Sequence, residues 1–391
     1  MKNDFIKFNS CKIWILCLII SLLPCSAVSG AETEMDFAEI LKENELSFDE
    51  IENAIEDSSL KGTVTFSEIL EKLWKGETGS AINDIGTLIK DSLFSELSEN
   101  RKNFARIILL AVFAALFSNL VSGMFSSSLQ DTGFFVVYLA MSGVILQSFF
   151  LMMSIAKGAL TEIFAFMEVF IPAYAIAITM VSGSGSSVAV YEITFLLIKG
   201  CQWVLKAVIL PLIEAYMMIG IVNCIGETDK FSNLGNLLKK VTEQILKWGT
   251  GMILGMNLIQ NMILPAVDSL KSTLWQKGLS AIPVAGNIMS ALTGSILGAS
   301  VLIKNSIGVG CLIMLILLCA VPIIKLLVFI LSFFVCSAFL QPISDKRLMK
   351  LLSMTGESGK LFLQTVITCM TLFFITIALA AISTNMRYYA G

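Results

Sequence analysis

The 391-residue sequence contains no histidine, and this absence excludes several kinds of active site. Without imidazole there is no Ser-His-Asp or Cys-His arrangement, and the commonest ligand of transition metals is missing. The nine cysteines form no CxxC pair, and none lies between residues 31 and 200, so neither a zinc cluster nor a disulfide framework is supported. Charged residues are also scarce, at 15% of the chain.

Phosphate-binding motifs are absent as well. The GxxxxGK[ST] pattern does not occur, and the run Ser182–Ser187 (SGSGSS) is typical of a flexible turn. We therefore predict no catalytic residue, no cofactor, no metal and no nucleic-acid partner. The protein is expected not to be an enzyme.

Apolar residues, in contrast, make up 56% of the chain, more than a soluble core could bury. Residues 31–100 carry 18 acidic and 5 basic side chains, whereas residues 101–391 carry 11 acidic and 19 basic ones. We predict an all-α protein in which a small acidic helical domain precedes a polytopic membrane bundle, with the lipid bilayer as its surroundings.

Residues 1–30 have the three parts of a secretory signal peptide. Lys2, Lys7 and Lys12 precede the apolar run Ile13–Leu23, and small residues follow up to a cleavage site near Gly30. The apolar run is too short to span a bilayer. The next segment, residues 31–102, is therefore expected on the extracytoplasmic side.

Residues 31–102 are predicted to form the acidic helical domain. Ser47–Glu50 and Thr65–Glu68 both match the capping box of a helix start, and apolar residues follow each at helical spacing. Two interpretations stay open: a docking domain for partner proteins, or three helices that pack on one another and expose a solvated acidic face.

Residues 103–391 are predicted to form the membrane domain, with seven to eight spans. A re-entrant segment is predicted at 278–303, because Pro283 and Gly286 interrupt it. The expected spans are 104–125 and 133–156 as a hairpin, 159–181, 188–226 as one or two, 250–267, 306–340 as one or two, and 361–382.

Several polar side chains fall inside these apolar segments, where they are costly and often functional. The alternative is that they sit at interfaces or pair internally to hold helices together. Glu192, Lys199 and Lys206 recur every seven residues and so nearly stack on one helix face. The remaining candidates are Glu162, Glu168, Glu214, Asn257 and Asn261.

Small residues at four-residue spacing form two ridges, Gly251 with Gly255 and Gly294 with Gly298. Such ridges let helix backbones approach in lipid, so we predict helix packing there, with pore lining as the alternative. Lys239, Lys240 and Lys247 lie in an amphipathic segment suited to an anionic membrane surface, and 345–360 is predicted as a basic connector.

The chain resembles the stage III sporulation protein AE family of endospore-forming Firmicutes. The resemblance is carried by Lys239–Lys247 with Trp248-Gly249, by Gly278–Gly286, and by Leu302–Gly308. It implies a multi-pass protein of the outer forespore membrane. There it would act with other stage III sporulation membrane proteins in a channel-like or secretion-like complex that links mother cell and forespore and sustains late forespore development. The family has no settled site residues to carry over.

Two further functions compete with that of a channel subunit. A secondary transporter for a small solute would use spans broken at Pro172, Pro211 and Pro322. An intramembrane enzyme could use paired acids such as Glu162 and Glu168, although the lack of histidine weakens this hypothesis most. Whether the chain forms a homo-oligomer is left open by the sequence.

Overall fold

The structure is a computed structural model, in which the described part of the chain is helical and contains no strand. The signal-peptide region, most of the 104–125 segment, and Asn257, Asn261 and Pro283 lie outside the described residues. The described residues are 49–56, 58, 65–74, 105, 109, 112, 127–182, 184–225, 230–249, 251, 255, 286–341 and 346–390.

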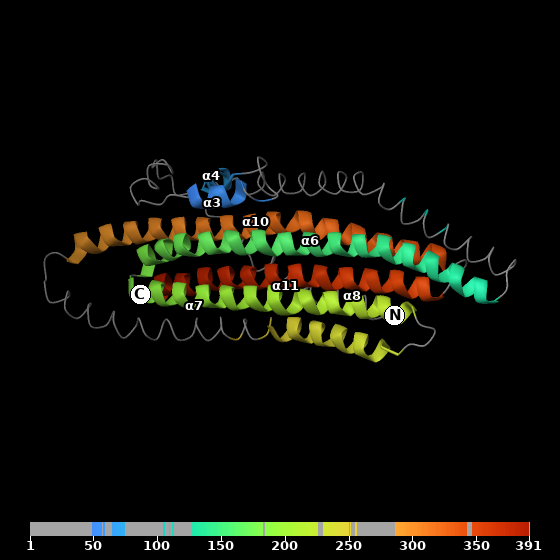
Figure 1. Cartoon of the computed structure of the whole chain (residues 1–391). Helices are drawn as coiled ribbons and strands as arrows, with labels where there is room; N and C mark the ends of the chain where they lie inside the picture. Colours follow the sequence, from blue (N-terminus) through green and yellow to red (C-terminus); the bar gives the residue numbers. More distant parts are fainter. Residues whose placement is uncertain are drawn as a thin grey trace.

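Four long helical rods lie side by side and form the body of the molecule (Figure 1). They are α6 (Ser127–Ser182), α7 (Ser184–Trp203) continued by η1 (Val204–Ile209) and α8 (Leu210–Ile225), α10 (Gly286–Leu340) and α11 (Lys346–Ala390). Within them, four segments are long and apolar enough to cross a membrane: Tyr138–Ile178, Thr194–Cys224, Asn305–Ala338 and Arg347–Ala378.

Side-chain contacts fix the direction of each rod. The hydroxyl of Tyr138 donates to the carbonyl of Ile221, so α8 runs antiparallel to α6. The Phe149–Phe362 and Phe164–Phe373 ring pairs, 5.5 and 5.4 Å between centroids, show that α6 and α11 run parallel. The α10 rod runs opposite to both. The start of α11, with Arg347 and Lys350, and the end of α8 at Ile225 therefore lie at the same end of the bundle.

The predicted separation of 133–156 from 159–181 was wrong, because both belong to the single helix α6. Gly158 between them is tolerated at a cost of about 1 kcal/mol relative to alanine. Buried residues continue across it at helical spacing, namely Met152, Ala156, Leu160 and Ile163. Packing of this continuous stripe on the bundle outweighs the local cost.

The 188–226 segment, for which one or two spans were predicted, is one continuous rod. Pro211 lacks an N–H and would clash with the carbonyl one turn before it. The six residues Val204–Ile209 adopt π-helical geometry just before this proline. A wider turn accommodates the proline without ending the helix.

The predicted connector and last span are also one helix, α11. Likewise, residues 286–303 continue without a turn into the next span as part of α10, and Pro322 lies inside that helix. The described part of the predicted re-entrant segment therefore contains no re-entrant turn, and Gly286 is the first residue of a 55-residue helix. The described residues contain four segments that could cross a membrane, whereas seven to eight spans were predicted for the whole chain.

Residues 232–249 form a further helix, called here the 232–249 helix, which we expected on the membrane surface. Instead it lies along α8 and α11 (Figure 1). The side-chain oxygen of Asn223 accepts a 2.9 Å hydrogen bond from the backbone N–H of Phe231 and so stabilises the turn into this helix. Leu246 is buried and joins the apolar core.

Helices α3 (Asp49–Glu56) and α4 (Phe66–Trp74) come from the acidic segment. Helix α4 begins at Phe66, directly after Thr65, as the capping pattern predicts. The two helices are joined by hydrogen bonds from Ser67 to the carboxylate of Glu52. Helix α3 packs on α6 and helix α4 on α10 (Figure 1). The buried apolar residues of the two helices are Ile51, Ile55, Phe66, Ile69 and Leu70.

The contact between α4 and α10 is close enough to be tested by one substitution. A Cβ at Gly310 would lie 2.9 Å from Cδ2 of Leu70 and 3.5 Å from the ring of Phe66. We expect Gly310→Phe to displace α4 from α10, so that protease cleaves the α3–α4 segment much faster than in the wild-type protein. Limited proteolysis followed by mass spectrometry measures this. Unchanged cleavage would contradict the contact.

Candidate functional site

Seven charged side chains lie on one face of α6 and the α7–α8 rod, and we call this set the charged face. Six of them fall inside segments that qualify as membrane spans, and Glu192 lies just outside. All are at least partly exposed. The members are Lys157, Glu162 and Glu168 of α6, Glu192 and Lys199 of α7, Lys206 of η1 and Glu214 of α8.

The centre of the charged face is an ion pair between two helices that the sequence could not connect. The Nζ atom of Lys199 donates to Oε1 of Glu168 at 2.7 Å. The two side chains remain 45% and 32% exposed. Lys199 also lies over the ring of Phe195, with its Nζ atom 5.3 Å from the centroid. The structure thus brings a predicted acid of one span to a predicted cation of the next.

Lys206 lies about two turns further along the same rod, inside the π-helical segment. Its Nζ atom is 5.6 Å from the ring centroid of Phe164, which is buried and packs edge-on against Phe373. The aromatic face stabilises the ammonium group electrostatically. Such π-helical segments occur frequently at functional sites.

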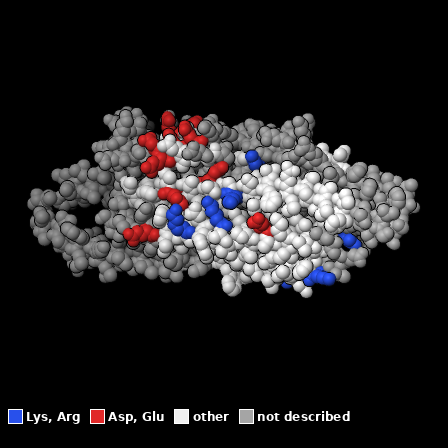
Figure 2. Space-filling model, viewed as in Figure 1, with Lys and Arg blue, Asp and Glu red and all other residues white. Residues whose placement is uncertain are grey.

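The charged face is not suited to hydrocarbon. A charged side chain at the centre of a lipid-exposed helix costs about 2.5–3.5 kcal/mol. Figure 2 shows acidic and basic side chains gathered on the middle of this face, while the surface toward the α8 end of the bundle is mostly uncharged. The face must therefore meet protein or water when the protein sits in a bilayer.

The predicted small-residue ridges have different surroundings. A Cβ at Gly251 or Gly255 meets nothing within 4 Å, so the described residues place no helix against either position. Gly294 and Gly298 lie in the first part of α10. Within the described residues, close helix contacts are made instead at Gly220, Gly310, Gly356 and Gly359.

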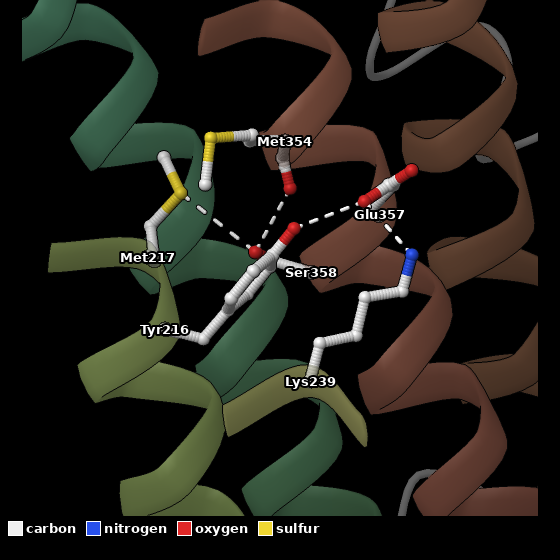
Figure 3. Close-up of polar contacts among 6 residues, drawn as sticks. All are labelled: Tyr216, Met217, Lys239, Met354, Glu357 and Ser358. Atoms are coloured by element: carbon white, nitrogen blue, oxygen red, sulfur yellow. Dashed lines mark hydrogen bonds and ion pairs between the residues drawn. The ribbon is translucent and has the colours of Figure 1, made fainter. Parts of the chain in front are cut away.

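A second polar cluster, which we call the α11 junction, joins α8, α11 and the 232–249 helix (Figure 3). The hydroxyl of Tyr216 donates to Oε2 of Glu357 at 2.9 Å, and Nζ of Lys239 lies 3.0 Å from the same oxygen. The hydroxyls of Thr355 and Ser358 point toward the sulfur of Met217, at 3.8 and 3.7 Å. One carboxylate thus holds three helices together.

Small residues of α11 also bring α10 to this place, and a Cβ at Gly359 would lie 3.0 Å from Sδ of Met152 on α6. A Cβ at Gly356 would be 3.1 Å from the ring of Phe334, and one at Gly359 would be 2.8 Å from Cγ1 of Ile330. Next to them, Nζ of Lys360 lies 4.3 Å from the centroid of the Phe334 ring. Several of the described helices therefore approach one another closely at the α11 junction.

The sequence analysis missed the α11 junction. Glu357 was assigned to a connector, and Tyr216 is one aromatic residue in an apolar run. The partners of Glu357 lie 141 and 118 residues away, so no local spacing links them. A signal was present in the two glycines that flank Glu357 and Ser358 on a helical stretch, since small residues at such spacing indicate close helix packing.

Comparison with known proteins gives a consistent result. A family model described as "Stage III sporulation protein AE" matches residues 64–384. A relative from Bacillus subtilis (strain 168), with the same description, is 23% identical over 296 residues, which cover 75% of this chain and 74% of the relative. No solved structure matches the chain. Both the charged face and the α11 junction lie inside the matched region.

Proposed function

The chain belongs to the stage III sporulation protein AE family, and from this premise we propose that it is an integral membrane subunit of a channel-like or secretion-like complex. This complex would connect the mother cell with the forespore and sustain late forespore development. Within it the chain would act as a membrane subunit and not as an enzyme. The other members would be stage III sporulation membrane proteins of the same assembly.

The charged face is the observation that carries this proposal. Four apolar rods fit a bilayer, but Lys199, Glu168 and Lys206 require a protein surface or water beside them. A subunit of a larger assembly supplies such surroundings, whereas a single bundle surrounded by lipid does not. The matched family and the four apolar helices support the sporulation role and the membrane location.

Orientation follows from the distribution of charge. Helix α4 packs on α10 at Gly310, 30 residues before the end of α10 at Leu340, whereas Arg347 and Lys350 lie in the first two turns of α11, next to that end. Basic residues near span ends favour the cytoplasmic side. We therefore place the acidic helices on the extracytoplasmic side of the outer forespore membrane and the basic end in the mother-cell cytoplasm.

The transporter alternative gains no support from the described helices. It required spans broken at Pro172, Pro211 and Pro322 to expose backbone groups to a solute. Helices α6 and α10 continue through their prolines, and the rod containing Pro211 widens to π geometry without unwinding.

We expect Glu168→Ala, Lys199→Ala and Lys206→Ala each to lower heat-resistant spore counts by about tenfold or more. The physical reason is that Glu168→Ala and Lys199→Ala each leave one member of the ion pair without its partner, and Lys206→Ala removes the cation that lies over the Phe164 ring. The measurement uses a sporulating strain whose own copy is replaced by this chain. Membrane immunoblots at the onset of engulfment show whether each variant is present at the wild-type level.

The control is Glu56→Ala, which removes an exposed acid of α3 and is expected to sporulate normally. The double change Glu168→Ala with Lys199→Ala separates the two interpretations of the ion pair. Normal sporulation of the double variant would mean that the pair only neutralises itself, which contradicts an assembly role for it. Co-purification of sibling sporulation membrane proteins from sporulating cells tests the complex directly.

A further inference from the structure

The middle of the charged face is sorted by helix, whereas Lys157 of α6 and Glu192 and Glu214 of the neighbouring rod lie to either side of it. At the level of the central ion pair, α6 contributes the acids Glu162 and Glu168, whereas the neighbouring rod contributes the cations Lys199 and Lys206. The 2.7 Å contact between Lys199 and Glu168 and the position of Lys206 over Phe164 fix this register. An acidic strip therefore runs beside a basic strip.

Such a pair of strips is complementary to itself. Two copies inserted in one membrane share their orientation, so a closed pair has its two-fold axis along the bilayer normal. When two copies meet face to face about this axis, α6 of one copy lies against α7 of the other. Glu168 of each copy then faces Lys199 of the second copy, and Glu162 lies on the side of the second copy's Lys206.

The shapes of the two strips also match. The exposed side of α6 carries small residues at helical spacing, namely Ser154, Gly158, Thr161 and Ala165. The exposed side of α7 carries two large apolar residues, Leu196 and Trp203, which are 70% and 65% exposed. Trp203 lies one turn from Lys199, which places it beside the level of Thr161 and Ala165 of α6. In such a pair, Trp203 of one copy would thus lie against small residues of the other copy's α6.

Lipid and water each suit only part of this face. Lipid is unfavourable for Lys199 and Glu168, and water is unfavourable for the exposed indole of Trp203. Interfaces between proteins combine both kinds of residue, and tryptophan is enriched among those that contribute most of the binding energy. We propose that a second copy of this chain covers the charged face, with α6 of each copy packed on α7 of the other.

This inference names the partner of the charged face and so rests on the proposed function, but its test does not depend on sporulation. Purified full-length protein in lipid nanodiscs reports self-association whether or not the larger complex exists. Failure of the pairing would leave the sporulation assay to judge the proposed function separately.

The decisive variant exchanges the two charges of the central pair, Glu168→Lys together with Lys199→Glu, and is called the swapped variant. It keeps an ion pair within each copy, so the fold is preserved. Two swapped copies remain complementary, but a swapped copy meets a wild-type copy with lysine against lysine and glutamate against glutamate. Like charges across an interface cost several kcal/mol.

Copies carrying two different tags are co-expressed, and recovery of the second tag through the first is measured. We expect wild-type with wild-type, and swapped with swapped, to be recovered equally. Recovery of the mixed pair should fall about tenfold or more. Equal recovery of mixed and matched pairs would overturn the proposal. A wild-type protein that is monomeric in nanodiscs would also overturn it, as would a different protein bound to the charged face.

A steric variant provides an independent measurement. A Cβ at Gly158 meets nothing within 4 Å in one copy, so Gly158→Leu leaves the monomer intact while blocking approach of the second copy's Trp203. We expect it to abolish pairing. Gly251→Leu is the matched control, because that glycine is also open but lies on neither α6 nor α7. Pairing that survives Gly158→Leu would contradict the proposed contact.

Discussion

Gly359→Leu is expected to destabilise the membrane bundle and lower its thermal midpoint markedly. A Cβ at this position would lie 2.8 Å from Cγ1 of Ile330 on α10 and 3.0 Å from Sδ of Met152 on α6. Both neighbours are buried, so neither can move aside without disturbing a second helix. Overpacking of a filled core costs about 1–3 kcal/mol and occasionally more, and a leucine adds three further carbons beyond Cβ. The measurement is the yield of monodisperse protein in mild detergent and its thermal midpoint.

Substitutions at two other glycines provide reference values for the thermal midpoint of Gly359→Leu. Gly143→Leu on α6 is the matched control, because a Cβ there meets nothing within 4 Å, and its midpoint should equal that of the wild-type protein. Gly220→Ala is intermediate, since its Cβ would meet the terminal methyl of Met354, which is the flexible end of a side chain. A midpoint for Gly359→Leu that matches the wild-type value would show that α11 does not pack on α6 and α10 as described.

Glu357→Ala is expected to lower the free energy of unfolding by about 1–3 kcal/mol, because hydrogen bonds to a charged group contribute about that much. The substitution leaves the hydroxyl of Tyr216 and the ammonium of Lys239 without the carboxylate that they share. The side chains of Glu357 and Lys239 are 29% and 31% exposed, so water compensates part of the loss. The effect should therefore be smaller than the loss of a fully buried pair.

A double-mutant cycle separates the ion pair from the rest of the α11 junction. Lys239→Ala, Glu357→Ala and their combination are compared with the wild-type protein by denaturant unfolding in detergent. We expect a coupling energy of at least about 0.5 kcal/mol, as is found for residues in one network. Tyr216→Phe with Glu357→Ala forms a second cycle for the hydroxyl. Strictly additive effects in both cycles would mean that the contacts drawn in Figure 3 do not stabilise the bundle.

Local signals predicted the parts of the fold that depend on neighbouring residues. The capping pattern at Thr65 gave the start of α4, and apolar spacing gave the buried face of α3 and α4. Charges inside apolar runs gave six of the seven members of the charged face, all except Lys157. Each of these inferences uses residues within two turns of one another, where helical periodicity is informative.

The length of the rods could not be obtained in the same way. Gly158, Pro211 and Pro322 are ordinary signs of a break. Two spans were predicted on either side of Gly158, and the segments with Pro211 and Pro322 were each predicted as one span or two. In the structure the buried stripe of α6 passes Gly158, and a π-helical turn precedes Pro211. Tertiary packing therefore overrides the local preference at these positions. Pairings such as Tyr216 with Glu357, 141 residues apart, have no local signature at all.

The unbroken course of α10 has a mechanical consequence. Helix α10 contacts α4 at Gly310. It also packs closely on Gly356 and Gly359 of α11, through Phe334 and Ile330. The 20 residues between Gly310 and Ile330 make about 30 Å of helix, which is roughly the hydrocarbon thickness of a bilayer. Helix α10 continues through Pro322, so no turn separates the two contacts. In the orientation proposed above, a force that a neighbour applies to α3 and α4 would therefore reach the α11 junction along this one helix.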